Sequence, residues 1–246
     1  MGEWIDSGAS GHRAYLALPE SRSGPGVLLL HAWWGLTPVF TGICDRLAEA
    51  GYVALAPSLF PGGATATTIP EAEALRDAGD EALVAEPVAR TAVAFLRGLP
   101  AVTGPTIGVI GYSLGAYWAL RLSQVLPDDV GAAVVFYGTD DGDYHAARAA
   151  YLGHFAEHDD FEPLPFIHAL EERMRAAGRE VTFYSYPGTR HWFVEPNRPE
   201  YDPAAANLAW ERTLTFLGDA LSEEDEATDQ HEVVPTAEAP RRGQQR

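Results

Sequence analysis

The fold is decided by the stretch Ile107-Gly108-Val109-Ile110-Gly111-Tyr112-Ser113-Leu114-Gly115-Ala116. An apolar run is followed there by the pattern G-x-S-x-G and then by a helical pattern that begins near Ala116. This order is typical of a nucleophile elbow, a sharp turn between a strand and a helix that strains the serine backbone and exposes its hydroxyl. Glycine is expected two residues before and after the serine, because a side chain there would collide with the neighbouring strand and helix. Ser113 is therefore the candidate nucleophile.

The segments on either side of this turn alternate between short strand patterns and helical patterns. Such alternation predicts an α/β fold with a mostly parallel central sheet and helices on both faces. The predicted strands are residues 13–18, 26–30, 52–56, 106–110, 131–137, 149–155 and 180–186. The predicted helices are residues 37–51, 71–99 with an interruption at Pro87, 116–126, 163–177 and 204–221.

Length, composition and charge narrow the class of protein. The chain has 246 residues, 46% of them hydrophobic, which is enough for one domain over residues 1–221. From Ser222 the composition becomes acidic and polar, so residues 222–246 are expected to form a disordered tail. The formal net charge of −18 argues against nucleic-acid binding, and no apolar run is long enough to predict a membrane span. The only cysteine, Cys44, fits a reducing, cytoplasmic location.

An activated serine needs a histidine base and an acid behind it, and in enzymes of this layout the acid precedes the histidine in the chain. His191 follows the last predicted strand, after a turn expected at Pro187-Gly188, and is the candidate base. The loop after the preceding strand offers four acids, Glu157, Asp159, Asp160 and Glu162. Of the adjacent pair Asp159 and Asp160, one side chain at most faces His191, and the other is solvated or caps the next helix.

The oxyanion of an acyl-transfer intermediate needs backbone N–H donors. Leu114 supplies one, and the turn 31–35 supplies the other. The tandem Trp33-Trp34 in that turn fits either a wall of the acyl pocket or packing beneath the next helix. His154 and His158 are expected to be structural or solvent-facing, and they lack the spacing of a metal-binding helix, so no metal or other cofactor is expected.

Four segments of the chain resemble the dienelactone hydrolase family of the α/β-hydrolase fold, namely Val27–Leu36, Gly111–Gly115, Gly153–Pro163 and Tyr186–Ala206. The last segment is specific, since its R-P-x-Y-x-P-x-A-A spacing recurs in family members. The resemblance runs from about residue 4 to residue 221 and implies a hydrolase of small esters or lactones. It places the acid on Asp159 and the two oxyanion donors on the backbone of Trp33 and Leu114.

Three positions depart from well-known family members. Those members use cysteine as the nucleophile where this chain has Ser113, and they carry glutamate in the oxyanion loop where it has Ala32. They also hold a substrate carboxylate with an arginine four residues after the histidine, where this chain has Glu195, a charge that would repel an anionic dienelactone. The resemblance therefore implies a serine-type relative with a triad of Ser113, Asp159 and His191. The residues expected to line the substrate pocket are Trp34, Tyr112, Trp192 and Glu195.

Two alternatives remain open beside a serine hydrolase. One is a cofactor-free perhydrolase, which would use the same triad, and the other is a binding protein of the same fold that has lost catalysis. The expected partner is a small-molecule ester or lactone rather than a nucleic acid or a membrane. The oligomeric state is not predicted.

Overall fold

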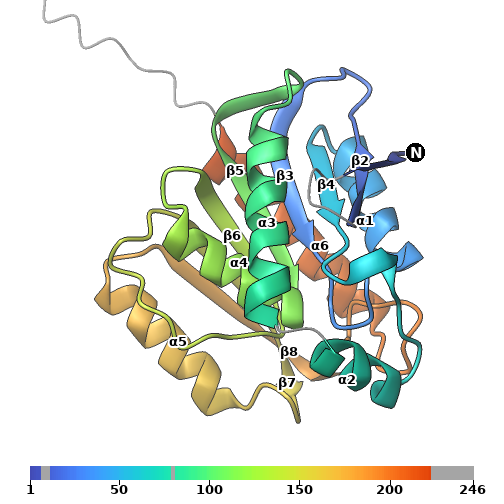
Figure 1. Cartoon of the computed structure of the whole chain (residues 1–246). Helices are drawn as coiled ribbons and strands as arrows, with labels where there is room; N and C mark the ends of the chain where they lie inside the picture. Colours follow the sequence, from blue (N-terminus) through green and yellow to red (C-terminus); the bar gives the residue numbers. More distant parts are fainter. Residues whose placement is uncertain (7–11, 79–80, 223–246) are drawn as a thin grey trace, which may run out of the picture.

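The fold is an eight-stranded sheet flanked by helices (Figure 1), seen in a computed structural model that describes residues 1–6, 12–78 and 81–222. The strands are β1 (Glu3–Asp6), β2 (Arg13–Ala17), β3 (Gly24–Leu30), β4 (Val53–Pro57), β5 (Val102–Tyr112), β6 (Val130–Phe136), β7 (Ala150–His158) and β8 (Val181–Arg190). Their order in the sheet is β1-β2-β4-β3-β5-β6-β7-β8. The six strands from β4 to β8 in this order are parallel, whereas β1 and β2 pair antiparallel at one edge. The predicted α/β fold with a mostly parallel sheet is confirmed.

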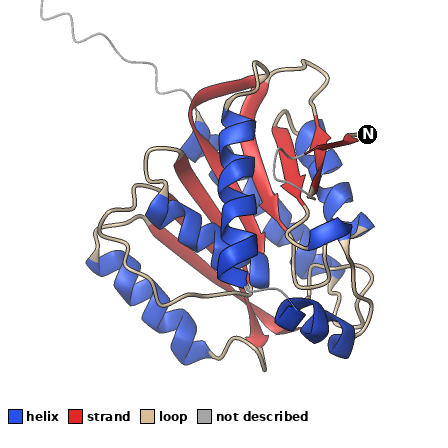
Figure 2. Cartoon of the chain, viewed as in Figure 1, coloured by secondary structure: helices blue, strands red, loops and turns tan. Residues whose placement is uncertain are grey.

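Helices cover both faces of the sheet, as predicted (Figure 2). The described helices are α1 (Pro38–Glu49), α2 (Ile69–Ala78), α3 (Glu81–Arg97), α4 (Leu114–Val125), α5 (Leu164–Ala176) and α6 (Pro203–Leu221), with a 3-10 turn η1 (Pro61–Gly63). The apolar faces of α1 and α6 pack on one side of the sheet, and those of α3, α4 and α5 pack on the other. Strand β3 alternates between these two cores: Val27 and Leu29 face α1 and α6, while Leu28 and Leu30 face the opposite set.

The predicted interruption at Pro87 is wrong, because Pro87 lies inside helix α3. The helix continues through the proline because the apolar face that follows it packs on the sheet, and tertiary packing outweighs the lost backbone hydrogen bond. The packed side chains are Val88, Ala89, Ala92, Val93 and Leu96. Helix α2 ends at Ala78 and α3 begins at Glu81, and residues 79–80 lie outside the described residues.

The predicted turn at Pro187-Gly188 is also wrong. Both residues lie inside β8, where the pairing with β7 changes register between Ala156 and His158. Gly188 has a φ of +74°, which a glycine adopts without strain, so the pair forms a bulge rather than a turn. The strand therefore continues to Arg190, directly before His191. Strand β1 at the edge of the sheet has no counterpart among the predicted strands.

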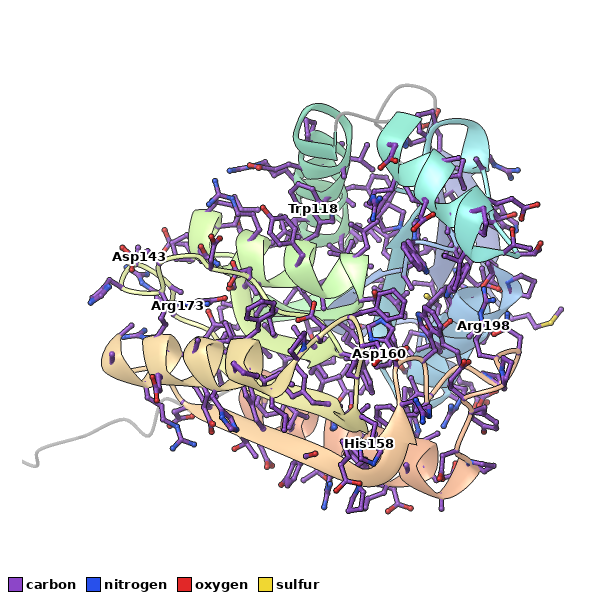
Figure 3. All side chains as sticks on the ribbon, turned by 90° about the horizontal axis from the view of Figure 1, so that it is seen from below. Trp118, Asp143, His158, Asp160, Arg173 and Arg198 are labelled. Atoms are coloured by element: carbon purple, nitrogen blue, oxygen red, sulfur yellow. The ribbon has the colours of Figure 1, made fainter. Side chains whose placement is uncertain are left out.

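The carboxyl ends of the parallel strands all lie at the same end of the sheet, and Figure 3 shows the molecule from below. The loops that follow β3, β5, β7 and β8 all begin at this end, so residues far apart in the sequence come together there. None of the described helices has the length and apolar character needed to cross a membrane. The tail predicted for residues 222–246 lies outside the described residues from residue 223 onward.

Candidate active site

Ser113 is the single residue between the end of β5 and the start of α4. Its φ of 50° and ψ of −114° are strained for a residue other than glycine, as the elbow requires. A Cβ on Gly111 would lie 2.2 Å from the carbonyl oxygen of Gly115, and a Cβ on Gly115 would lie 2.2 Å from that of Leu30. Because these neighbours are backbone atoms that cannot move aside, both positions need glycine for the reason that the sequence pattern indicated.

His191 stands between the other two residues of the predicted triad. Its Nε2 lies 3.1 Å from the Oγ of Ser113, and its Nδ1 lies 2.8 and 2.9 Å from the two carboxylate oxygens of Asp159. An Nδ1–H that donates to the carboxylate leaves Nε2 as the acceptor of the serine hydroxyl proton. The side chains of His191 and Asp159 are only 5% and 3% exposed, so water screens this pair weakly.

Asp159 is the only one of the four candidate acids in contact with His191 among the described residues. Its Oδ1 also accepts the backbone N–H groups of Phe161 and Glu162, both at 2.9 Å, which fixes the carboxylate orientation. Asp160 is exposed on the loop after β7 (Figure 3) and does not cap helix α5, whose N-cap is Pro163. The remaining two acids bind elsewhere: Glu157 accepts from the Gly188 N–H, and Glu162 accepts from the Thr139 hydroxyl.

Two backbone N–H groups, one at the start of α4 and one in the loop after β3, are the candidate oxyanion donors. Leu114 is the first residue of α4, where helical N–H groups have no intrahelical acceptor and the helix dipole favours negative charge. Trp33 lies in the loop after β3. Neither backbone N–H has an acceptor within the part of the chain that the structure describes. Both are therefore available to an oxyanion.

A cluster of aromatic rings lies against His191. It consists of Trp33, Trp34, Phe161 and Trp192, whose ring centroids lie 5.1–6.2 Å apart in the pairs that touch. Phe161 and Trp192 lie 4.9 and 5.0 Å from the imidazole of His191. The three indoles are almost fully buried, and their N–H groups have no acceptor among the described residues. Trp33 and Trp34 thus both pack in the core and border the site. The sequence does not predict Phe161 as a site residue, and this side chain is 46% exposed where it contacts Trp33 and Trp192.

Tyr112 does not join this cluster. Its ring packs between Phe40 and Phe136, at centroid distances of 5.3 and 4.5 Å, and borders a cavity between α1 and α6. Alternation along β5 explains the placement, because a residue adjacent to the elbow serine points to the opposite side of the chain. The structure therefore separates Tyr112 from Trp34 and Trp192, while its ring lies 6.3 Å from that of Tyr137, the residue that donates to Glu195.

Glu195 is 1% exposed and accepts a hydrogen bond of 2.7 Å from the hydroxyl of Tyr137. The Tyr137 ring lies 4.7 Å from the ring of His191, so the buried carboxyl is linked to the site through this tyrosine. Burial raises the pKa of Glu195 to about 7, against the opposing effects of the Tyr137 hydrogen bond and the positive charge of Arg198. The guanidinium of Arg198 itself lies 3.2 Å from the centroid of the Trp34 ring.

Tyr137 and Arg198 were both missed as site residues. Arg198 is the first residue of the R-P-x-Y spacing, which was the available signal, whereas Tyr137 ends a strand pattern that reads as core. The other histidines of the region have the expected roles. His154 is buried between Tyr186 and Thr213, and burial lowers its pKa to about 3, while His158 is exposed beside Glu157.

No group of three or more histidine, cysteine or acidic side chains within the described ranges is arranged to hold a metal ion. Cys44 is buried in α1, where burial raises the pKa of its thiol, and this makes it a poor nucleophile.

Proteins of known sequence or structure are similar to this chain over most of its length. Protein usf of Aquifex pyrophilus is 27% identical over 232 residues, which cover 90% of this chain and 100% of that protein. A carboxymethylenebutenolidase of Rhodococcus opacus is 29% identical over 220 residues, covering 82% of this chain and 83% of that protein. A solved structure also resembles this chain, namely the crystal structure of the dienelactone hydrolase-like promiscuous phosphotriesterase P91 from metagenomic libraries. It superposes on this chain with a TM-score of 0.77 at 20% sequence identity, and the match covers 89% of this chain and 97% of that one, so the two share the fold.

The family profile described as "Dienelactone hydrolase family" matches residues 12–221. This span begins in front of β2 and ends with α6, so it contains the elbow, the acid loop and the histidine loop. The predicted α/β-hydrolase fold is confirmed, and the chain belongs to the dienelactone hydrolase family.

Proposed function

We propose that this member of the family is a serine hydrolase that cleaves a small ester or lactone through an acyl-enzyme. The observation that carries the proposal is the continuous hydrogen-bonded chain from the Ser113 hydroxyl through both nitrogens of His191 to Asp159. The strained backbone of Ser113 adds support, because such strain is retained where the surrounding structure over-determines it, often at a reaction centre.

In the proposed reaction the Oγ of Ser113 attacks the substrate carbonyl carbon, while the Nε2 of His191 takes the hydroxyl proton. The carbonyl oxygen becomes an oxyanion that accepts hydrogen bonds from the backbone N–H groups of Trp33 and Leu114. His191 then gives its proton to the leaving alkoxide, and the carbon–oxygen bond breaks to leave an acyl-serine. A water molecule, deprotonated by His191, then attacks the acyl carbon. The bond between this carbon and the Oγ of Ser113 breaks, the acid leaves, and His191 returns the proton to Oγ. Throughout, Asp159 holds the Nδ1–H and stabilises the imidazolium cation.

A serine makes this chain more dependent on its base than a cysteine would be. A thiol attacks as a thiolate, which a modest fall in pKa makes available, whereas a serine hydroxyl must lose its proton during the attack. The short contacts on both sides of His191 meet that requirement. The position that holds glutamate in cysteine-type members is occupied by Ala32, which is fully buried and carries no charge.

The charge of the substrate is expected to matter because of Glu195. Its ionised form disfavours an anionic substrate, and its raised pKa of about 7 means that this charge is only partly present near neutral pH. Neutral esters are therefore the expected substrates, and discrimination against anionic ones should weaken as pH falls below about 7.

The test is a panel of esters and lactones with matched neutral and anionic members, assayed with the wild type, Ser113→Ala and the exposed control Ser21→Ala. Ser113→Ala is expected to abolish turnover, and Ser21→Ala is expected to match the wild type. Undiminished turnover by Ser113→Ala would refute the proposal. Turnover that requires acetate and peroxide and leaves every ester intact would favour the perhydrolase alternative instead.

A further inference from the structure

A cavity of about 270 Å³ lies between α1 and α6, separate from the contacts that join Ser113, His191 and Asp159. Its floor is formed by Tyr112 and Phe136 at the ends of β5 and β6, and its walls are formed by one face of each helix. The loop after β8 closes one end with Val194, Pro196 and Tyr201. This volume is close to the lower limit of small-molecule sites and holds a body the size of one aromatic ring with a polar substituent.

The floor of the cavity presents an unpaired hydrogen-bond donor. Tyr112 is 2% exposed, and its hydroxyl has no hydrogen-bond partner among the described residues. The hydroxyl is not one of the fully enclosed unpaired groups of the described residues, so it is reachable from the cavity and can donate to a ligand there. Burial raises the pKa of this phenol, so the hydroxyl keeps its proton and acts as a donor at neutral pH.

One wall of the cavity presents an unpaired cation. The guanidinium of Arg46 lies 4.0 Å from the centroid of the Trp210 ring, and both residues line the cavity. No described carboxylate lies within ion-pair distance of Arg46. The neighbouring Asp45 is bound instead to the Gly2 N–H and the Tyr15 hydroxyl. An arginine stacked on an aromatic ring keeps its N–H edge available for a carboxylate.

The rest of the lining is mostly apolar. Pro38, Val39, Ile43, Phe136 and Val194 offer hydrocarbon or ring surface, and Asn207 and Tyr201 add neutral polar groups near the rim. The cavity thus combines one cation, one phenol donor and an apolar body. The acidic group that acts on Tyr112 is Glu195, which lies between the lining residues Val194 and Pro196 but does not line the cavity, and its raised pKa of about 7 keeps part of it neutral. That combination selects an anion whose charge sits at one end of an apolar group.

We propose that this cavity is a second ligand site, distinct from the triad, for a small monocarboxylate with an apolar or aromatic body. The carboxylate lies against the Arg46 guanidinium and accepts from the Tyr112 hydroxyl, and the body of the ligand packs on Phe136 and Ile43. The proposal does not depend on the reaction assigned to Ser113.

The six tryptophans of the chain allow the site to be located directly. Trp210 lines the cavity, whereas Trp33, Trp34 and Trp192 form the cluster beside His191. The full chain labelled with 5-fluorotryptophan is titrated with benzoate and followed by fluorine NMR, with each resonance assigned by a single Trp→Phe substitution. Benzoate is expected to shift the Trp210 resonance in a saturable manner, with a dissociation constant in about the millimolar range or tighter. Neutral benzamide is expected to bind at least about tenfold more weakly.

Two variants test the assigned contacts. Arg46→Gln should weaken benzoate binding about tenfold or more, and Tyr112→Phe should weaken it severalfold. The matched control is Arg212→Gln on α6, whose guanidinium lies 3.7 Å from the centroid of the Tyr184 ring, outside the cavity, and which should leave binding unchanged. The proposal is overturned if no resonance shifts up to about 10 mM benzoate. It is also overturned if the shifts occur at Trp33, Trp34 or Trp192 instead, or if Arg46→Gln and Arg212→Gln behave alike.

Discussion

Glu195→Gln should raise the free energy of unfolding at alkaline pH and should change this free energy little at acid pH. The carboxyl of Glu195 has a pKa of about 7 in the fold and an ordinary value of 4.5, so the folded state binds its proton more tightly than the unfolded state does. Below the unfolded value both states are protonated and ionisation has no cost. As pH rises from 4.5 through 7, the fold must carry an unfavourable buried charge, and stability falls.

The size of the effect follows from the same two values. Each unit of pKa corresponds to about 1.4 kcal/mol, so the cost of the ionised carboxyl reaches about 3 kcal/mol above pH 8. Glutamine removes this cost and keeps an oxygen that accepts the Tyr137 hydroxyl. Buried His31 and His154, with pKa values lowered to about 4 and about 3, also make stability pH-dependent. As pH falls below 6.5, these histidines take up protons in the unfolded state while they stay neutral in the fold, so the free energy of unfolding falls until pH reaches their folded pKa values. The effect of these two histidines is the same in the wild type and in Glu195→Gln, so it cancels in the difference between their free energies of unfolding.

The assay is urea unfolding of the wild type and Glu195→Gln at a series of pH values from about 5 to about 9. The exposed Glu73→Gln serves as the control for losing one negative charge from a chain of net charge −18. The difference in unfolding free energy should grow in favour of Glu195→Gln as pH rises. A variant that becomes less stable than the wild type as pH rises would refute the reasoning, because it would mean that Tyr137 and Arg198 stabilise an ionised Glu195.

The remaining predictions concern the triad and the elbow. Asp159→Asn should lower kcat/KM by about 10⁴-fold, because it favours the wrong imidazole tautomer, whereas Asp160→Asn should change kcat/KM less than about threefold. Steady-state kinetics on a neutral ester measure both effects. A larger loss in Asp160→Asn than in Asp159→Asn would move the acid by one position. Gly115→Ala should lower the melting temperature and abolish activity, because its Cβ would lie 2.2 Å from the Leu30 carbonyl oxygen. Gly42→Ala in α1, where a Cβ meets nothing within 4 Å, should raise stability by about 0.5–1 kcal/mol, and equal melting temperatures for the two variants would contradict the steric account.

The elbow could be predicted because its glycines and the apolar run before Ser113 form a recognisable sequence pattern, and the order of the triad because it follows the chain order of this fold. The glycines at 111 and 115 are dictated by backbone atoms a few ångströms away, and the strand before Ser113 is signalled by its own apolar run. The acid could be narrowed to one loop by chain order, yet the choice of Asp159 over Asp160 depends on which carboxylate accepts the N–H groups of Phe161 and Glu162. The composition of the loop alone does not decide that choice, whereas the family resemblance and the folded structure do.

Features that depend on tertiary packing could not be predicted. Glu195 reads as a surface charge in the sequence, and only the fold shows that it is buried against Tyr137, a residue 58 positions earlier in the chain. The sequence predicts Tyr112 as a residue of the substrate pocket, although strand alternation places it at the cavity between α1 and α6. Pro187 and Gly188 carry a strong turn signal, and pairing with β7 converts it into a bulge.

The most direct test of the central claim is intact and peptide mass spectrometry of the full chain after reaction with a fluorophosphonate probe. One phosphonyl group is expected on Ser113 in the wild type, with none on Ser113→Ala and slow labelling of Asp159→Asn. Labelling on another residue, or an unlabelled Ser113 beside an intact His191 and Asp159, would contradict the assignment of a serine nucleophile.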